Sequence, residues 1–213
     1  MNITVFGATG AIGQQVVNEL LARGDSVTAH VRNPAKIPAT WDGRVRVVTG
    51  ELTDATSIDE AIAGAGVVVS TLGPSMDRNA TGLPLVDGVR MITEAMRRHG
   101  IHRYIGHGTP SIPDPQEKQT FQTRMIRFMG RRFLPRAYQE LVGMSALVMV
   151  DDLEWTIVRF TAPTDGPAKG SLRVGFYGAD RIGFTVTRAD IAQFTAEQVH
   201  TDTYLRRAPA ISN

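Results

Sequence analysis

The chain has 213 residues, of which 42% are hydrophobic and 21% are charged, as in globular proteins and unlike disordered chains. It contains no cysteine, which excludes a disulfide framework, thiolate zinc sites and a cysteine nucleophile. Its net charge of +2 is too small to indicate nucleic acid or a membrane as a partner, and no apolar run reaches the roughly 20 residues of a membrane span.

Strands and helices are predicted to alternate along the chain. The predicted strands are residues 2–6, 26–31, 44–48, 67–71, 103–106 and 155–159, with an edge strand at 203–207. The predicted helices are residues 11–23, 56–63, 84–98 and 188–199. The apolar run at 67–71 is typical of a strand covered on both faces, so we expect an α/β fold with a doubly wound parallel sheet.

The sequence shows no internal division. No repeat, low-complexity tract or Gly/Ser linker interrupts it, so residues 1–213 are expected to form a single domain. Met1 and Asn2 lead directly into a strand-like segment, and we therefore expect no signal peptide and a cytoplasmic location. No metal site is predicted.

Three glycines lie between the first predicted strand and the first predicted helix. Gly7 allows a tight turn, Gly10 lets a pyrophosphate approach the backbone, and Gly13 lets the helix pack close to the sheet. The free N–H groups at the start of the helix then face the phosphates. This context predicts a dinucleotide-binding loop, with a structural turn as the alternative. The predicted loop residues are Gly7, Thr9, Gly10, Ala11, Ile12 and Gly13.

The end of the second predicted strand indicates which dinucleotide binds. An NAD site presents an acidic residue there for the ribose 2′-hydroxyl, whereas this chain has no acidic residue between that strand and Asp42. Arg32 can instead bind a 2′-phosphate through two hydrogen bonds, with Asn33 and Lys36 as helpers. We therefore predict NADP(H) as the cofactor, with a solvent-exposed, purely structural Arg32 as the alternative.

Several motifs, taken in order, resemble those of the atypical short-chain dehydrogenase/reductase group. They are GATGAIG at 7–13, VRNPAK at 31–36, GELTD at 50–54, STLG at 70–73, RYI at 103–105, LEWTIVRF at 153–160 and TRADIA at 187–192. The likeness is to the NAD(P)H-binding set that includes NmrA-like proteins and the biliverdin/flavin reductase type. It implies a Rossmann-type fold with sheet order 3-2-1-4-5-6 and a final strand at 211–213.

The resemblance also implies further cofactor contacts. Leu52 and Thr53 would line the adenine pocket, and residues Thr71, Leu72 and Gly73 would cover the ribose and pyrophosphate. Glu51 departs from the Asp that is more usual in the family. Asp54 and Asp190 are better explained as acids at helix starts than as catalytic groups.

The predicted chemistry lies after the fifth strand, near the nicotinamide. His107 is a candidate proton donor at neutral pH, and Thr109 and Ser111 are candidate hydrogen-bond partners of the substrate carbonyl or the carboxamide. The alternatives are a surface histidine and hydroxyls that bond to nearby backbone groups.

The Tyr-x-x-x-Lys pair of conventional short-chain dehydrogenases is incomplete. Tyr138 is followed four residues later by Val142, and no other tyrosine has lysine at that spacing. A tyrosine of ordinary pKa, about 10, is a poor base at neutral pH. The resemblance therefore favours reductases of flavins and conjugated tetrapyrroles, which use hydride delivery and a solvent proton.

The segment 116–137 is basic and partly apolar, with six basic residues and one acid. Phe121, Met125, Met129 and Phe133 are spaced four apart, while Gly130 and Pro135 interrupt the run. One hypothesis is a substrate-side lid within 107–150 whose arginines attract an anionic aromatic substrate. The alternatives are an amphipathic helix packed on the core and, less favoured because of the interruptions, a membrane-surface helix.

These features favour an NADPH-dependent oxidoreductase that reduces a small conjugated, flavin-like or quinoid acceptor by hydride transfer. A second class is a non-catalytic NADP(H)-binding redox sensor like the NmrA-like proteins, and a third is an isomerase or cyclase that uses the cofactor structurally. The expected partner is a small molecule, with no nucleic acid and no membrane, and the protein is expected to be a monomer or homodimer.

Overall fold

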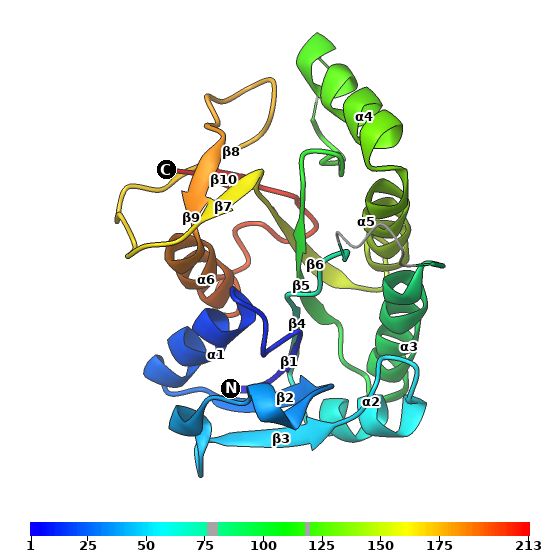
Figure 1. Ribbon diagram of the computed structural model, residues 1–213, viewed down its shortest axis with the longest axis vertical. Coiled ribbons are helices and arrows are strands. Elements are labelled where there is room, and N and C mark those ends of the chain that lie inside the picture. Colours follow the sequence, from blue (N-terminus) through cyan, green and yellow to red (C-terminus); the bar gives the residue numbers. More distant parts are fainter. Residues whose placement is uncertain (76–80, 118–119) are drawn as a thin grey trace.

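A mostly parallel sheet runs through the centre of the computed structural model, which describes residues 1–75, 81–117 and 120–213 (Figure 1). Its strand order is β3-β2-β1-β4-β5-β6-β10-β8. The strands are β1 (Asn2–Phe6), β2 (Ser26–Val31), β3 (Val45–Thr49), β4 (Val67–Ser70), β5 (Arg103–Gly108), β6 (Glu154–Arg159), β8 (Arg173–Gly175) and β10 (Ala210–Ser212). Only β8 runs antiparallel to its neighbour within this sheet, and β7 (Ala162–Thr164) and β9 (Thr185–Thr187) form a separate parallel pair.

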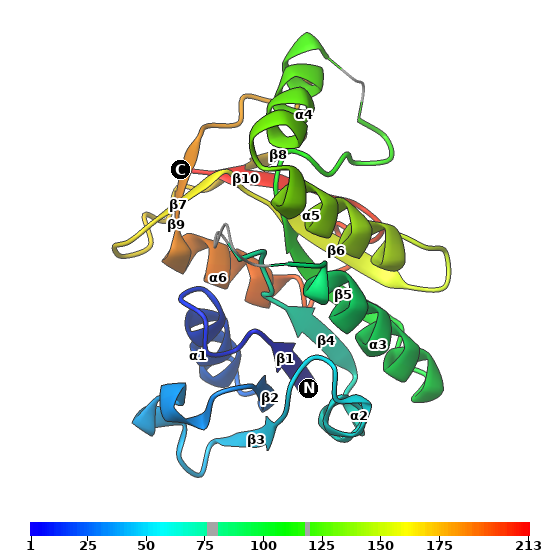
Figure 2. The same ribbon diagram turned by 45° about the vertical axis from the view of Figure 1, so that its right-hand side comes forward.

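Helices cover both faces of the sheet (Figure 2). One face carries α1 (Gly13–Ala22) and α6 (Arg188–Glu197), and the other carries α2 (Ala55–Ile62), α3 (Pro84–Arg98) and α5 (Pro135–Val148). Buried side chains form two core clusters that match these layers, one containing Leu20 and Ile191 and the other containing Ile58 and Ile92. Burial on both faces explains the continuous apolar strand β4.

The register of the strands determines where a site can form. Phe6 of β1 lies opposite His30 of β2 and Ser70 of β4, and Ser70 lies opposite Gly106 of β5. The carboxyl ends of these parallel strands therefore meet at one edge of the sheet. In doubly wound folds, ligands bind outside this edge.

One helix, α4 (Phe121–Phe133), projects away from the rest of the molecule. It begins with a capping box, in which Thr120 and Thr123 satisfy each other's backbone N–H groups. It ends at Leu134, immediately before Pro135 opens α5. Across the described ranges, no helix has both the length and the apolar character needed to cross a membrane.

The α/β fold and the predicted strand order are confirmed, with three differences. The first helix begins at Gly13 rather than at residue 11, because a turn closed by the Gly10 N–H and the Gly7 carbonyl occupies the preceding residues. The predicted edge strand at 203–207 is wrong, since this segment forms turns and only Arg207 makes an isolated bridge, to Thr156. The predicted final strand at 211–213 corresponds to β10, but the sheet continues beyond it to the antiparallel β8, which was not predicted.

Candidate functional site

The glycine loop is a tight turn held against β4. Gly7 has a φ of +75°, a conformation that favours glycine, and the Gly10 N–H donates to the Gly7 carbonyl at 2.9 Å. The Thr71 hydroxyl donates to the carbonyls of Phe6 at 3.1 Å and Gly7 at 3.0 Å. Thr71, at the end of β4, thereby fixes the loop in place.

The three glycines differ in what surrounds them. A Cβ at Gly13 would lie 2.2 Å from the Gly7 carbonyl oxygen, and one at Gly7 would lie 2.8 Å from the Thr71 hydroxyl. A Cβ at Gly10 would meet only the Gly7 oxygen, at 3.2 Å, and Gly10 is exposed. Gly7 and Gly13 are therefore needed for packing, whereas Gly10 leaves the outer surface of the loop open to a ligand.

The start of α1 is suited to an anion. Ile12 occupies the N-cap position without a side-chain cap, and the first turn contains no acidic residue. Thr9 and Ala11 complete the turn, and the Thr9 carbonyl accepts from the Gln14 side chain at 3.1 Å. Uncapped N–H groups and the positive end of the helix dipole fit a pyrophosphate.

The residues predicted to select the cofactor follow β2 and are exposed. Asn33 uses its side-chain oxygen to accept from the Ala35 N–H at 3.0 Å, so it shapes the turn at Pro34–Lys36. Arg32 makes no hydrogen bond or ion pair within the described chain, and its exposed guanidinium fits a phosphate ligand. Asp54 caps α2 by accepting from the Thr56 and Ser57 N–H groups, as expected.

The remaining predicted cofactor residues also lie at the carboxyl edge. Leu52 is half-buried and packs against α3, where a Cβ at Gly88 would lie 2.9 Å from the Leu52 Cβ. Thr53 and Gly73 are exposed, and Leu72 is half-buried against the core cluster of α2, α3 and α5. Leu52 and Leu72 thus combine core packing with an edge that a ligand can contact.

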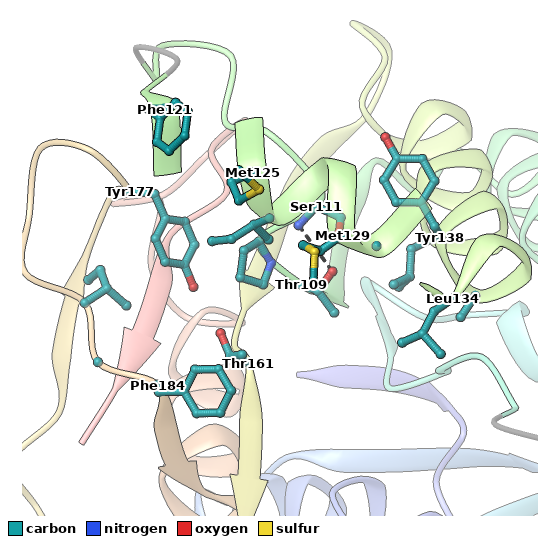
Figure 3. Close-up of a pocket in the computed structure, with 17 residues that line it drawn as sticks. Thr109, Ser111, Phe121, Met125, Met129, Leu134, Tyr138, Thr161, Tyr177 and Phe184 are labelled. Atoms are coloured by element: carbon teal, nitrogen blue, oxygen red, sulfur yellow. Dashed lines mark hydrogen bonds between the residues drawn. The ribbon is translucent and has the colours of Figure 1, made fainter. Parts of the chain in front are cut away.

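A cavity of about 720 Å³ lies beyond the carboxyl ends of β5 and β6, between α4, α5 and the segment that joins β8 to β9 (Figure 3). Its lining is mainly apolar, with hydroxyl groups from Thr109, Ser111, Thr161 and two tyrosines. Among the described residues that line it, none carries a formal charge at neutral pH. The lining residues are Thr109, Pro110, Ser111, Phe121, Met125, Ile126, Met129, Gly130, Leu134, Ala137, Tyr138, Leu141, Thr161, Tyr177, Ile182, Gly183 and Phe184.

Tyr177 is the more buried of the two tyrosines that line the cavity. Its side chain points toward Thr161 (Figure 3), and the Arg159 guanidinium lies 4.9 Å from its ring centroid. Burial raises the pKa of Tyr177, while the Thr161 hydroxyl and the Arg159 charge lower it to a smaller extent. Tyr177 is therefore protonated at neutral pH and can donate a hydrogen bond.

Two ion pairs hold the loop after β5. Buried Arg159 donates to both carboxylate oxygens of Glu117 at 2.9 Å and to the Ile112 carbonyl at 2.9 Å. Arg207 donates to the buried Asp114 carboxylate at 2.9 Å. These pairs tie residues 112–117, which follow Thr109 and Ser111, to β6 and to the segment before β10.

His107 does not line the large cavity. Its Nε2 lies 2.9 Å from the Thr195 hydroxyl, which itself donates to the Ile191 carbonyl, so Nε2 carries the proton. Burial beside Phe160 lowers the pKa of His107 to about 4. The histidine is thus neutral at pH 7, and this argues against the proton-donor role that the sequence suggested.

Thr109 and Ser111 do line the cavity, and the Ser111 N–H donates to the Thr109 hydroxyl oxygen at 3.3 Å (Figure 3). Tyr138 lines it from α5, while Val142 lies one turn further along the same helix. The neighbouring Glu140 is buried and accepts hydrogen bonds from the Leu85 N–H and from Arg136. Its carboxylate therefore links α5 to the start of α3.

The apolar stripe of α4 is not packed on the core, in contrast to the packed-helix alternative. Phe121, Met125 and Met129 line the cavity, and Phe121 is 79% exposed. Lys118 lies outside the described residues. These three residues of the stripe therefore form one wall of the cavity instead of joining the core, while Phe133 lies outside the lining.

Sequence reasoning missed the opposite wall of the cavity. Thr161, Tyr177, Ile182 and Phe184 come from the region after β6, which contains little regular structure. The available signal was a glycine-rich stretch with aromatic residues between the strand at 155–159 and the last helix. That signal says nothing about which cavity the aromatic residues face.

The fold and the glycine loop together define a dinucleotide-binding protein. The chain belongs to the NAD(P)H-binding family, whose model matches residues 7–202.

Curated relatives match parts of the chain. Sterol demethylase protein B of Methylococcus capsulatus is 33% identical over 109 residues, which are 49% of this chain and 33% of that protein. The mitochondrial 40 kDa subunit of NADH-ubiquinone oxidoreductase of Neurospora crassa is 30% identical over 55% of this chain and 33% of its own length. The chain thus spans about a third of these longer proteins. The 3-diazoavenalumate denitrifying reductase of a Streptomyces species is 28% identical over 82% of this chain and 60% of that protein.

Solved structures share the fold over the whole chain. A short-chain dehydrogenase/reductase of Veillonella parvula, in complex with NADP, has a TM-score of 0.80 and 21% identity over 100% of this chain and 94% of its own. The anaerobillin reductase ChuY of Escherichia coli O157:H7 has a TM-score of 0.80 and 20% identity over 99% of this chain and 96% of its own.

Proposed function

We propose that this protein is an NADPH-dependent oxidoreductase that delivers hydride to a small conjugated, flavin-like or quinoid acceptor. The observation that carries the proposal is the apolar cavity of about 720 Å³ at the same carboxyl edge as the glycine loop. A cavity of this size and character fits a flat organic molecule. The reductases among the relatives and structural neighbours support the same reaction class.

The proposed cofactor contacts follow the open groups at that edge. The backbone around Gly10 and the first turn of α1 bind the pyrophosphate, and Arg32 binds the 2′-phosphate of the adenosine ribose. Leu52, Thr53 and residues 71–73 contact the adenosine half. Bound NADPH supplies the hydride, and the protein positions the acceptor and excludes water.

The acceptor is proposed to be uncharged where it lies within the cavity. The arginines of α4 do not belong to the lining, so any anionic substituent must extend to the rim. Hydroxyl groups of Thr109, Ser111 and Tyr177 are available to hydrogen-bond the acceptor. Tyr177, which remains protonated, is proposed to orient a carbonyl or ring nitrogen, with the final proton coming from solvent.

A second candidate is a non-catalytic NADP(H) sensor. The observation that favours it is the lack of an efficient proton donor: among the described lining residues, the ionisable groups are Tyr138 and Tyr177. Val142 supplies no charge to activate Tyr138. Hydride transfer to a conjugated acceptor needs no such activation, and for this reason we place the reductase first.

Consumption of NADPH with a panel of flavins, quinones, enones and aldehydes tests the proposal. We expect turnover with a conjugated acceptor and little with simple aldehydes. Met129→Trp, which fills the cavity, should raise KM for the acceptor while the Kd for NADPH stays unchanged. Phe128→Ala, on the same helix but outside the lining, is the matched control and should behave like the native protein. NADPH binding without oxidation by any acceptor would favour the sensor.

A further inference from the structure

Two aromatic side chains on α4 are unexplained by the cavity. Phe128 is 61% exposed and Phe133 is 63% exposed, and neither belongs to the cavity lining. Exposed aromatic side chains on a projecting helix cost solvation free energy unless another surface covers them. The acceptor site accounts for Phe121, Met125 and Met129 but not for these two residues.

The same helix is strongly basic. It carries Arg124, Arg127, Arg131 and Arg132 and contains no acidic residue. Over the ranges that the structure covers, no carboxylate pairs with any of these four arginines. Arg132 instead lies 5.8 Å from the ring centroid of Phe133. Helical spacing places Arg124, Arg131 and Arg132 around the exposed Phe128.

We propose that α4 binds the surface of an anionic lipid bilayer, with Phe128 inserted at the interface and the exposed Arg124, Arg131 and Arg132, which flank it on the same face of the helix, on the lipid headgroups. Helices that combine Phe, Leu or Met with arginines lie in this plane of the membrane. Basic side chains near an anionic leaflet each add to the attraction. The position of α4 at one end of the molecule leaves it free to make this contact (Figures 1 and 2).

The structure removes the reason for disfavouring a membrane contact. The net charge of +2 describes the whole chain, whereas the positive charge that matters is concentrated on α4. Gly130 does not interrupt the helix, which continues to Phe133. Because α4 is also one wall of the cavity, attachment brings the cavity next to the bilayer. The binding itself does not depend on the proposed reaction.

Vesicle flotation with the full chain tests this inference. The probes are vesicles of pure phosphatidylcholine and vesicles of phosphatidylcholine with phosphatidylglycerol. We expect binding to the anionic vesicles that weakens as salt is added, and little binding to the neutral vesicles. Equal binding to both compositions, or binding to neither, would overturn the proposal.

Two double variants test separately the aromatic and the charge contributions to lipid binding. Phe128→Ser with Phe133→Ser, and Arg124→Glu with Arg131→Glu, should each weaken binding to anionic vesicles by about tenfold or more. The charge-matched control is Arg23→Glu with Arg44→Glu, two exposed arginines outside α4, and it should bind like the native protein. NADPH-induced thermal shifts check that every variant folds.

Self-association is the competing explanation for an uncovered apolar face. Size-exclusion chromatography should show no change in oligomeric state between the native protein and the phenylalanine double variant. A native dimer that becomes monomeric in this variant would show that a second copy of the chain covers α4, and would overturn the lipid proposal.

Discussion

Arg32 is the residue on which the proposed preference for NADPH depends. It follows β2 directly, it is exposed, and within the described residues it has no hydrogen-bonding partner that a substitution would disrupt. A change at this position therefore tests ligand binding with little effect on the fold.

Arg32→Glu should weaken NADPH binding by about tenfold to a hundredfold, since a charge-assisted hydrogen bond contributes roughly 1.5–3 kcal/mol. NADH lacks the 2′-phosphate, so its Kd should change little. Titration of tryptophan fluorescence with both cofactors provides the measurement, and Arg44→Glu controls for the change in overall charge. Equal affinities for NADPH and NADH in the native protein would contradict this assignment.

His107 should affect the free energy of unfolding rather than the rate of catalysis. Its pKa in the folded protein is lowered to about 4, below the 6.5 of a free histidine, because burial disfavours the charged ring. Between these two values the unfolded chain takes up a proton that the folded chain does not. Stability is therefore fully present above about pH 6.5 and is lost as the pH falls toward 4.

Urea unfolding across this pH range compares the native protein with His107→Gln. The variant should show a shallower decrease, with a difference of at most roughly 1.4 kcal/mol per pH unit. Parallel profiles would show that the histidine is not held neutral. At pH 7 the variant should keep turnover within about tenfold of the native value.

The two tyrosines of the cavity should differ in importance. Tyr177→Phe removes a protonated hydroxyl proposed to orient the acceptor, and kcat should fall by about tenfold or more. Tyr138→Phe should reduce kcat by less than about tenfold, because Val142 carries no charge that could activate the phenol. Steady-state kinetics with the best acceptor gives both values. A thousandfold loss in Tyr138→Phe with unchanged NADPH affinity would mean that another cation activates Tyr138.

At the scale of elements, the sequence predicted those features whose interacting residues lie close together in the chain. The glycine loop could be recognised because strand, turn and helix are adjacent in sequence, and Asp54 could be recognised as a cap because its partners are two and three residues away. The cavity wall formed by Tyr177 and Phe184 could not, since it depends on how the segment between β8 and β9 folds against α4. The exposure of α4 likewise depends on what the rest of the chain leaves uncovered.

The glycine loop offers a matched pair of substitutions. Gly10→Ala places its methyl on the open side of the turn, so the protein should fold with a near-native Tm and lose its NADPH-induced stabilisation. Gly13→Ala places the same methyl 2.2 Å from the Gly7 carbonyl, so the Tm itself should fall. Thermal shift with and without NADPH measures both. An unchanged NADPH response in Gly10→Ala would exclude the loop as the phosphate site.

At the scale of the whole molecule, the sheet brings two separate functions to one edge. The ends of β1, β2 and β4 provide the residues proposed for the cofactor, and the ends of β5 and β6 open into the cavity. Buried pairs Arg159–Glu117 and Arg207–Asp114 hold the cavity side in place. In the proposed reductase, hydride passes from the cofactor at the ends of β1, β2 and β4 to an acceptor in the cavity at the ends of β5 and β6.

The most direct test of this account follows the transferred hydrogen itself. The native protein is mixed with NADPH deuterated at the hydride-donating carbon and with a conjugated enone, because a hydride delivered to carbon does not exchange with solvent, and the product is analysed by mass spectrometry. We predict that the reduced acceptor carries the deuterium and that, at the same low acceptor concentration, less labelled product forms when Met129→Trp narrows the cavity. Tight NADPH binding by the native protein, with no label in the enone and no oxidation of NADPH by any acceptor of the panel, would contradict the proposed reductase.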